Sequence, residues 1–444
     1  MRTVFISLLS LAIASCSAEE KAPPVAEEPP IIGTPTPNPT PSPTPAPSTS
    51  ALDLTGKVLV VEGDELGFGA QSYAERYAAE NPTLKVHNFS SEGATIDTLM
   101  ARRQETLALN PHVISVSLTL HDICAASDAR TWADGINEYV APFKERGTIV
   151  VITTPLPRDS ADDDDCDRRH SERFRGTTNR AFDSGARDFD AVAHFGGDKG
   201  LSAPGATLDS NQYVDGVLPT SSAQERLAEI YSRTMDSVWS VILGEPAPIA
   251  PADDGVTIIV AEGSSSAMTS SDYFNGLYKS KGGFDEWHAA AVGGSGIDSL
   301  SSRLQRVKFK NADVVSLYIG ANDLHSYNSS SEFIQKLKDY TNSLRERGTK
   351  VLVFTLPNRT LRGEIDHQHN KLRKEFKAIF DQADWIDGYV DFAGHPVMGT
   401  DDAPLNPTLY RDGLHATPYG HQRYFEVYEP AMDRVIAARH PQRQ

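Results

Sequence analysis

Three consecutive serines, Ser264–Ser266, stand in the segment AEGSSSAM, which directly follows an apolar run at 256–260. A serine hydroxyl is a useful nucleophile at neutral pH only when an adjacent base takes its proton. The candidate base is His415, in the segment RDGLHATPYGH, and Asp412 three residues earlier can hold its imidazole in the productive tautomer. These residue types predict nucleophilic chemistry at a carbonyl carbon.

Two further segments supply groups that could stabilise a developing oxyanion. Asn322 lies in IGAND, after another apolar run, and its side-chain amide can donate a hydrogen bond. Gly294 lies in VGGSGIDSL, where its backbone N–H can be a second donor. Taken alone, each motif is more typical of a turn or a helix cap. The prediction depends on finding all four in this order, each after an apolar run.

The elements that must position these residues are strands and helices in alternation. The runs 256–260, 314–320 and 350–357 are typical of buried strands. Such alternation predicts a parallel sheet covered by helices on both faces, with the ligand site beyond the carboxyl ends of the strands. Between the last two runs, Ser329–Ser331 can cap a helix with four apolar residues on one face: Phe333, Leu337, Tyr340 and Leu344.

The chain also repeats itself at an offset of about 200 residues. KERGT at Lys144–Thr148 returns as RERGT at Arg345–Thr349, and YVDGVLPT at Tyr213–Thr220 matches YRDGLHAT at Tyr410–Thr417. We therefore expect a duplicated domain.

The predicted organisation has two α/β domains, at 53–243 and 255–440, joined by a linker at 244–254. Residues 17–52 form a Pro/Thr/Ser-rich linker that cannot bury a core. The chain of 444 residues has the length and composition of a soluble globular protein, and its net charge of −18 argues against a nucleic-acid partner.

The second copy resembles the SGNH hydrolases (GDSL-like lipases and esterases) over about 255–440. The resemblance implies a flavodoxin-like, three-layer fold with a five-stranded parallel sheet, and ester hydrolysis through an acyl-enzyme that needs no cofactor. It implies a catalytic triad of Ser265, His415 and Asp412, and an oxyanion hole made by the backbone amides of Ser265 and Gly294 with the side chain of Asn322. The motifs that carry it are Gly263-Ser264-Ser265, Gly294, Gly320-Ala321-Asn322-Asp323 and Asp412-Gly413-Leu414-His415.

Two departures from the family pattern concern the serine segment. Ser264 stands where the family has an aspartate, so the register rests on the match of Glu62–Glu65 with Glu262–Ser265. Ser264 and Ser266 remain alternative nucleophiles. The family's glycine a few residues beyond the nucleophile is absent, which leaves the shape of the substrate loop open.

The first copy lacks both the nucleophile and the base, and we expect it to be a degenerate, non-catalytic domain. Gly93 and Asp215 are retained from the motifs. The replacements are Glu65 for the nucleophile, Leu218 for the base, and Thr119 and His121 for the glycine and asparagine of the third motif.

Acidic and imidazole groups in the first copy raise the question of a metal. Asp64, Glu65, His121 and Asp122 are suitable ligand types. Drift after the loss of catalysis leaves the same residues, and the acidic run 162–165 is typical of a solvated loop. We therefore predict no metal site.

The N-terminus predicts a lipid anchor. Residues 1–16 have a basic residue, a short apolar core and the ending Ile13-Ala14-Ser15-Cys16, which resembles a bacterial lipobox. The resemblance implies cleavage before Cys16, acylation of its thiol and, from Ser17, sorting to the outer membrane or cell surface. An ordinary secretory signal is the alternative. In that oxidising compartment Cys124 and Cys166 are a candidate disulfide, with two free thiols as the alternative.

The sequence thus predicts an ester hydrolase of the cell envelope. Its substrate is a carboxylic ester, with acetyl esters of glycans and lipid esters both open, and its membrane contact is the lipid anchor. The rival interpretation is a non-catalytic lipoprotein that binds glycan or envelope polymer through two SGNH-like folds.

Overall fold

The computed structural model describes most of the chain beyond the N-terminal linker. The described residues are 52–118, 122, 129–157, 189–202, 206–214, 216, 218–244, 256–268 and 272–440. The predicted signal peptide with Cys16, and most of the predicted linkers, lie outside these ranges. So do Thr119, His121, Cys124, the acidic run 162–165, Cys166 and Asp215.

The first sheet is fully parallel and has the order β2-β1-β3-β4-β5. Its strands are short, and all but the edge strand β2 consist mostly of buried residues: β1 Val58–Gly63, β2 Lys85–Asn88, β3 Val113–Ser117, β4 Ile149–Thr153 and β5 Ala191–Ala193. The helices that accompany it are α1 Tyr73–Glu80, α2 Ile96–Ala108, α4 Ala129–Glu145, α6 Lys199–Ser202 and α7 Ser221–Leu243. Helix α1 packs against α7, and α2 packs against α4.

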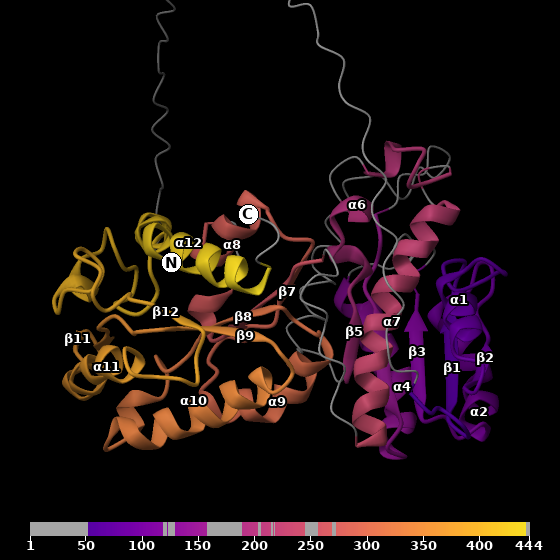
Figure 1. Cartoon of the computed structure of the whole chain (residues 1–444), viewed down its shortest axis with the longest axis horizontal. Helices are drawn as coiled ribbons and strands as arrows, with labels where there is room; N and C mark the ends of the chain where they lie inside the picture. Colours follow the sequence, from indigo (N-terminus) through magenta and orange to yellow (C-terminus); the bar gives the residue numbers. More distant parts are fainter. Residues whose placement is uncertain are drawn as a thin grey trace, which may run out of the picture. The chain divides into compact units, whose positions relative to one another are not determined.

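The second sheet is also fully parallel, with the order β7-β6-β8-β9-β12. Its strands are β6 Ile258–Gly263, β7 Glu286–Ala289, β8 Val314–Tyr318, β9 Lys350–Phe354 and β12 Gly388–Val390. Helices α8 Phe274–Lys281 and α12 Pro418–Arg439 lie on one face (Figure 1). The other face carries α9 Ile297–Phe309, α10 Ser330–Arg345 and α11 His367–Phe380.

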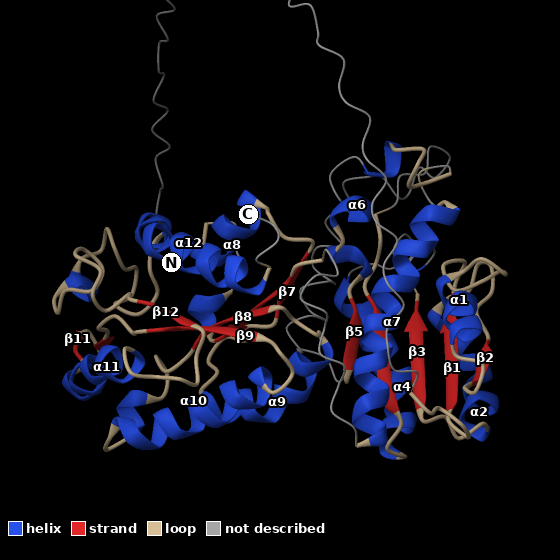
Figure 2. Ribbon diagram, viewed as in Figure 1, coloured by secondary structure: helices blue, strands red, loops and turns tan. Residues whose placement is uncertain are grey.

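The prediction of an α/β fold with parallel sheets is confirmed, and both sheets have five strands in the same order (Figure 2). Each passes from its second strand to its third by way of the first, the 2-1-3-4-5 order of flavodoxin-like folds. In both, the first strand therefore lies between the second and third, and its carboxyl end lies where the strand order reverses, the usual place of a ligand site. This is where β6 delivers the serine segment.

Local sequence explains the helix starts. Ser329 caps α10 in extended backbone geometry, and the four apolar residues predicted to share one face are all buried. Thr417 caps α12 by accepting a hydrogen bond from the Gly420 N–H, and Pro418 fills the first helical position, where no N–H is needed. The predicted strand at 256–260 begins two residues later and extends to Gly263.

Besides the strand order, each sheet has matching contacts of its own. Buried Glu62 pairs with Arg102, as buried Glu262 pairs with Arg303. The turn between Tyr213 and Pro219 closes with an isolated antiparallel bridge, and a bridge between Tyr410 and Ala416 closes the matching turn. Within the described ranges, no helix combines the length and the hydropathy needed to cross a bilayer.

Candidate active site

The serine, histidine and aspartate predicted from the sequence lie in one hydrogen-bonded row. Ser265 Oγ is 2.8 Å from His415 Nε2, and His415 Nδ1 is 2.6 Å from Asp412 Oδ2. The carboxylate can only accept, so Nδ1 carries the proton and donates it to Asp412. Nε2 is then the acceptor for the Ser265 hydroxyl, which is the arrangement a general base requires.

The end of strand β6 presents Ser265 to this histidine. Gly263 has a φ of +138°, and a Cβ there would lie 1.9 Å from the Tyr318 carbonyl oxygen, so only glycine fits. Ser264 and Ser266 are buried, at 1% and 8% exposure, whereas Ser265 is half-buried and faces His415. The geometry therefore singles out Ser265 among the three serines.

Backbone amides hold the Asp412 carboxylate in place. Its Oδ1 accepts from the N–H groups of Leu414 (3.0 Å) and His415 (2.7 Å). Burial raises the pKa of Asp412, but hydrogen bonds from the His415 backbone, the His415 ring and Leu414 outweigh it, and the pKa lies below its ordinary value. Asp412 therefore stays ionised and keeps the His415 ring oriented through the neutral pH range.

Two of the predicted oxyanion donors, Gly294 and Asn322, belong to loops that contact each other. Asn322 Nδ2 donates to the Ser295 carbonyl oxygen (3.0 Å), which ties this amide to the loop that contains Gly294. A Cβ built on Gly293 would lie 3.9 Å from the Ser265 Cβ, so this loop passes close to the serine. An amide nitrogen carries two N–H bonds, and one of them orients the Asn322 side chain here.

The asparagine turn is anchored to helix α9. The Asp323 carboxylate accepts from the Ile297 N–H at 2.8 Å, at the first residue of that helix. Burial raises the pKa of Asp323 to about 6. A Cβ on Gly296 would lie 2.5 Å from Asp323 Oδ1, so a glycine is needed for this close approach.

One segment that sequence reasoning missed contacts both the Asn322 turn and the His415 turn. Arg359 is 6% exposed, donates to Asp366 (2.9 Å) and also donates to the Ala321 carbonyl oxygen. The next residue, Thr360, donates through its N–H to the Gly413 carbonyl oxygen (2.9 Å). A single segment after β9 thus contacts the turn with Asn322 and the turn with His415. No local signal in NRTLRGE marks an arginine as buried.

A second missed feature lies behind the histidine turn. His421 is buried, and its ring stacks on Tyr273 with the centroids 4.0 Å apart. Arg411 Nη2 donates to the Tyr273 hydroxyl at 2.5 Å. Burial lowers the pKa of His421 to about 4, so this second histidine of RDGLHATPYGH is neutral at pH 7 and acts as a packing group.

After β1 of the first sheet, a carboxylate stands at the place that Ser265 takes after β6. Glu65 Oε1 accepts from the Gly93 N–H at 3.1 Å, and Gly93 has a φ of +70°, close to the +77° of Gly294. Leu218, at the position of the base, is 37% exposed. Among the described residues, no group of three or more His, Cys, Asp or Glu side chains could hold a metal ion.

Part of the chain matches a known protein family. Residues 258–423 match the GDSL-like Lipase/Acylhydrolase family, and the chain therefore contains one GDSL-like lipase/acylhydrolase domain. No curated protein shows significant similarity to the chain.

Solved structures similar to part of the chain include TesA, at 18% identity over 40% of this chain and 96% of that chain, with a TM-score of 0.32. Axe2, an acetylxylan esterase from Geobacillus stearothermophilus, is 17% identical over 41% and 95%, with a TM-score of 0.31. The acetyl xylan esterase AlAXEase is 13% identical over 39% and 98%, with a TM-score of 0.33.

Proposed function

We propose that this protein is a serine esterase that hydrolyses carboxylic esters through an acyl-enzyme on Ser265. The observation that carries the proposal is the row from Ser265 Oγ through His415 to Asp412, with distances of 2.8 and 2.6 Å. The match of this segment to the acylhydrolase family supports it. A hydroxyl, an imidazole and a carboxylate in this order have the geometry of a nucleophile, its base and the group that orients the base, and they lie beyond the carboxyl edge of a parallel sheet, where ligands bind.

The first half-reaction forms the acyl-enzyme. Ser265 Oγ attacks the ester carbonyl carbon while His415 Nε2 takes the hydroxyl proton, and the carbonyl oxygen becomes an oxyanion. When the tetrahedral intermediate collapses, the bond to the alcohol oxygen breaks and His415 returns the proton to that oxygen. The ionised Asp412 stabilises the imidazolium that forms between these two steps.

The second half-reaction releases the acid. A water molecule gives a proton to His415 and attacks the acyl carbon, and the Ser265 oxygen leaves with that proton. In both halves the oxyanion would be held by the backbone N–H groups of Ser265 and Gly294 and by the Asn322 amide. Each such donor contributes about 2.7–4 kcal/mol of transition-state stabilisation in comparable enzymes. Acetyl esters of glycans and lipid esters are the substrates we consider.

We further propose that the chain arose by duplication and that its first domain does not catalyse hydrolysis. The equal strand order and the matched Glu–Arg pairs support a common origin. Glu65 supports the loss of catalysis, since its carboxylate accepts from Gly93, the position that corresponds to the proposed donor Gly294. A carboxylate at this place excludes the oxyanion of an intermediate.

The sequence motifs outside the described residues complete the proposal. Cys16 would carry the lipid that anchors the protein at the outer membrane or cell surface, and Cys124 would pair with Cys166. The Pro/Thr/Ser-rich linker would hold the catalytic domain away from the bilayer.

A kinetic comparison tests the catalytic assignment. Full-length wild type, Ser265→Ala and the matched controls Ser264→Ala and Ser266→Ala would be assayed on p-nitrophenyl acetate and butyrate. We expect Ser265→Ala to lose at least about 10³-fold in kcat, because the acyl-enzyme cannot form. Both controls should keep measurable turnover. If wild type shows no turnover, the binding-protein alternative is favoured. A loss of turnover in Ser264→Ala or Ser266→Ala alone would assign the nucleophile to that serine.

A further inference from the structure

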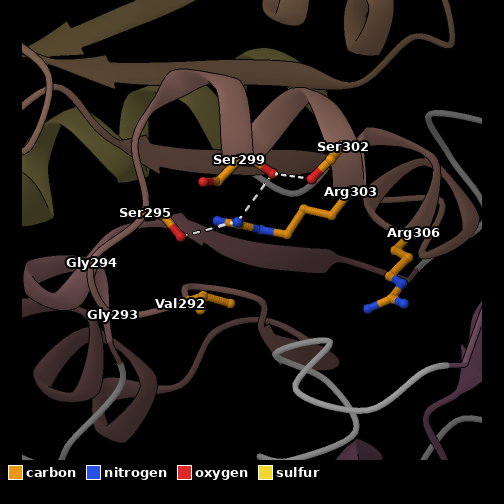
Figure 3. Close-up of a pocket in the computed structure, with 8 residues that line it drawn as sticks. All are labelled: Val292, Gly293, Gly294, Ser295, Ser299, Ser302, Arg303 and Arg306. Atoms are coloured by element: carbon orange, nitrogen blue, oxygen red, sulfur yellow. Dashed lines mark hydrogen bonds between the residues drawn. The ribbon is translucent and has the colours of Figure 1, made fainter.

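A polar pocket lies beside the proposed oxyanion hole. Its volume is about 370 Å³, within the range of small-molecule sites. One wall is the loop Val292–Ser295, and the other is a face of helix α9 (Figure 3). The lining on the helix consists of Ser299, Ser302, Arg303 and Arg306.

The pocket is connected to the reacting serine through the glycine loop. Gly293 and Gly294 line it, and a Cβ on Gly293 would lie 3.9 Å from the Ser265 Cβ. Gly294 is also a proposed oxyanion donor. An ester whose carbonyl oxygen accepts from the Gly294 N–H would lie at the edge of this pocket, so one of its two substituents can extend into it.

The residues that line the pocket indicate whether it suits the acyl group or the alcohol of the ester. Ser295, Ser299 and Ser302 bring hydroxyl groups, Arg303 and Arg306 add two charged side chains, and Val292 is the one aliphatic side chain among the lining residues. An alkyl chain gains little by leaving water for such a surface, since the gain depends on apolar contact. A hydroxylated group loses little, because it exchanges hydrogen bonds with water for hydrogen bonds with the wall.

Of the two arginines that line the pocket, Arg303 is held in place by several hydrogen bonds. Arg303 donates to the buried carboxylate of Glu262 (2.7 Å), to Ser295 Oγ (3.0 Å) and to the Ser299 carbonyl oxygen (3.2 Å). Glu262 compensates the positive charge of Arg303, so this side chain makes the wall polar without itself requiring an anion. Figure 3 shows the Arg303 side chain extended from α9 towards the glycine loop.

The exposed helix face offers both kinds of hydrogen-bonding group. Ser302 donates its hydroxyl proton to the Ser299 carbonyl oxygen (2.8 Å), which leaves the Ser302 Oγ lone pairs as acceptors. Ser299, three residues earlier on the same face, is exposed and has a hydroxyl that can donate. Sugar hydroxyls both donate and accept, and they fit such a surface.

We propose that this pocket binds the alcohol part of the ester and that this alcohol is carbohydrate-like, with several free hydroxyl groups. The inference rests on the proposed esterase function and narrows it, since it selects glycan esters over lipid esters. The acyl group, which lies on the other side of the carbonyl carbon, is not bound in this pocket.

The test compares two substrates that share an acetyl group. The kcat/KM of full-length protein would be measured on acetylated cellobiose, by acetate release, and on p-nitrophenyl acetate. Ser302→Leu places an alkyl group in the pocket. Ser301→Leu is the matched control, because Ser301 is exposed on the same helix but does not line the pocket. We expect Ser302→Leu to lower the kcat/KM on acetylated cellobiose, relative to that on p-nitrophenyl acetate, roughly tenfold, because a loss of one or two hydrogen bonds has an effect of this size. Ser301→Leu should leave this ratio unchanged.

An unchanged ratio in Ser302→Leu would overturn the proposal. A gain on p-nitrophenyl decanoate in that variant would also overturn it, because an acyl chain would then occupy the pocket. Cellobiose binding, measured by titration calorimetry, does not depend on hydrolysis. If wild type hydrolyses neither ester but binds cellobiose more tightly than Ser302→Leu does, the proposed esterase function is refuted, whereas carbohydrate binding in the pocket is supported. Equal cellobiose affinity in the two proteins would refute the pocket.

Discussion

The contact between Gly413 and Thr360 gives a sharp prediction about how the triad is positioned. Gly413 lies between Asp412 and His415, is buried and has a φ of +74°. A Cβ on this residue would lie 1.9 Å from Thr360 Oγ1 and 2.9 Å from both Thr360 Cβ and Cγ2. Rotation of the threonine side chain cannot relieve the overlap, because its Cβ is itself too close and a second branch replaces the first.

The structure sets the size of the effect of Gly413→Ala. Left-handed backbone geometry costs an alanine about 1–2 kcal/mol relative to glycine. The overlap must also push the turn away from Thr360 by about 1 Å, and a displacement of that size in a catalytic group costs about 10²-fold in rate. We therefore expect kcat to fall about 100-fold while KM changes little, since the variant misplaces the base and leaves the substrate pocket intact.

A double-mutant cycle separates the overlap from the backbone strain. Thr360→Gly removes the side chain but keeps the hydrogen bond from its N–H to the Gly413 carbonyl oxygen. The double variant Gly413→Ala/Thr360→Gly should recover about tenfold in kcat on p-nitrophenyl acetate over Gly413→Ala alone. Full activity in Gly413→Ala would refute the positioning argument. So would a double variant no faster than the single one.

Three further predictions concern stability and the first domain. Asp323 has a pKa of about 6 against an ordinary 3.8, so its charged form is disfavoured by about 3 kcal/mol in the folded protein, and stability is lost as the pH rises from about 4 through 6. In urea titrations, the free energy of unfolding of Asp323→Asn relative to wild type should therefore be higher at pH 8 than at pH 4. The exposed control Asp298→Asn should show no such difference, and equal behaviour of the two variants would contradict the burial argument. Glu65→Ala should keep kcat/KM on p-nitrophenyl acetate within about twofold of wild type, because Glu65 belongs to the first sheet, and a loss of tenfold or more would show that this domain takes part in hydrolysis. Arg303→Met leaves the buried Glu262 carboxylate unpaired and should lower the free energy of unfolding by about 3–5 kcal/mol, and a change below 1 kcal/mol would show that the pair is not a buried ion pair.

The features predicted correctly from the sequence are those encoded locally. Strand runs followed by polar residues, the capped helix with Phe333 on its buried face, and the three-residue spacing of Asp412 and His415 all depend on neighbours in the chain. The internal repeat predicted Ser265 as the nucleophile, and its hydroxyl lies 2.8 Å from His415 Nε2, whereas Ser264 and Ser266 are buried; its catalytic role stays a prediction.

The features that sequence reasoning missed depend on contacts between distant segments. Arg359 reaches Ala321 across 38 positions, and Tyr273 stacks on His421 from a different helix start. Neither periodicity nor turn chemistry reports such distances, so these features came from the structure alone.

The most direct test of the central claim is covalent labelling of the nucleophile. Full-length wild type and Ser265→Ala would be treated with a fluorophosphonate, and the modified peptide would be mapped by mass spectrometry. A serine activated by His415 should react at Ser265, and His415→Ala should abolish the label because the hydroxyl then lacks its base. Label confined to Ser265 and absent from both variants is the result that the triad predicts. Label on a different residue, or no label on wild type, would contradict it.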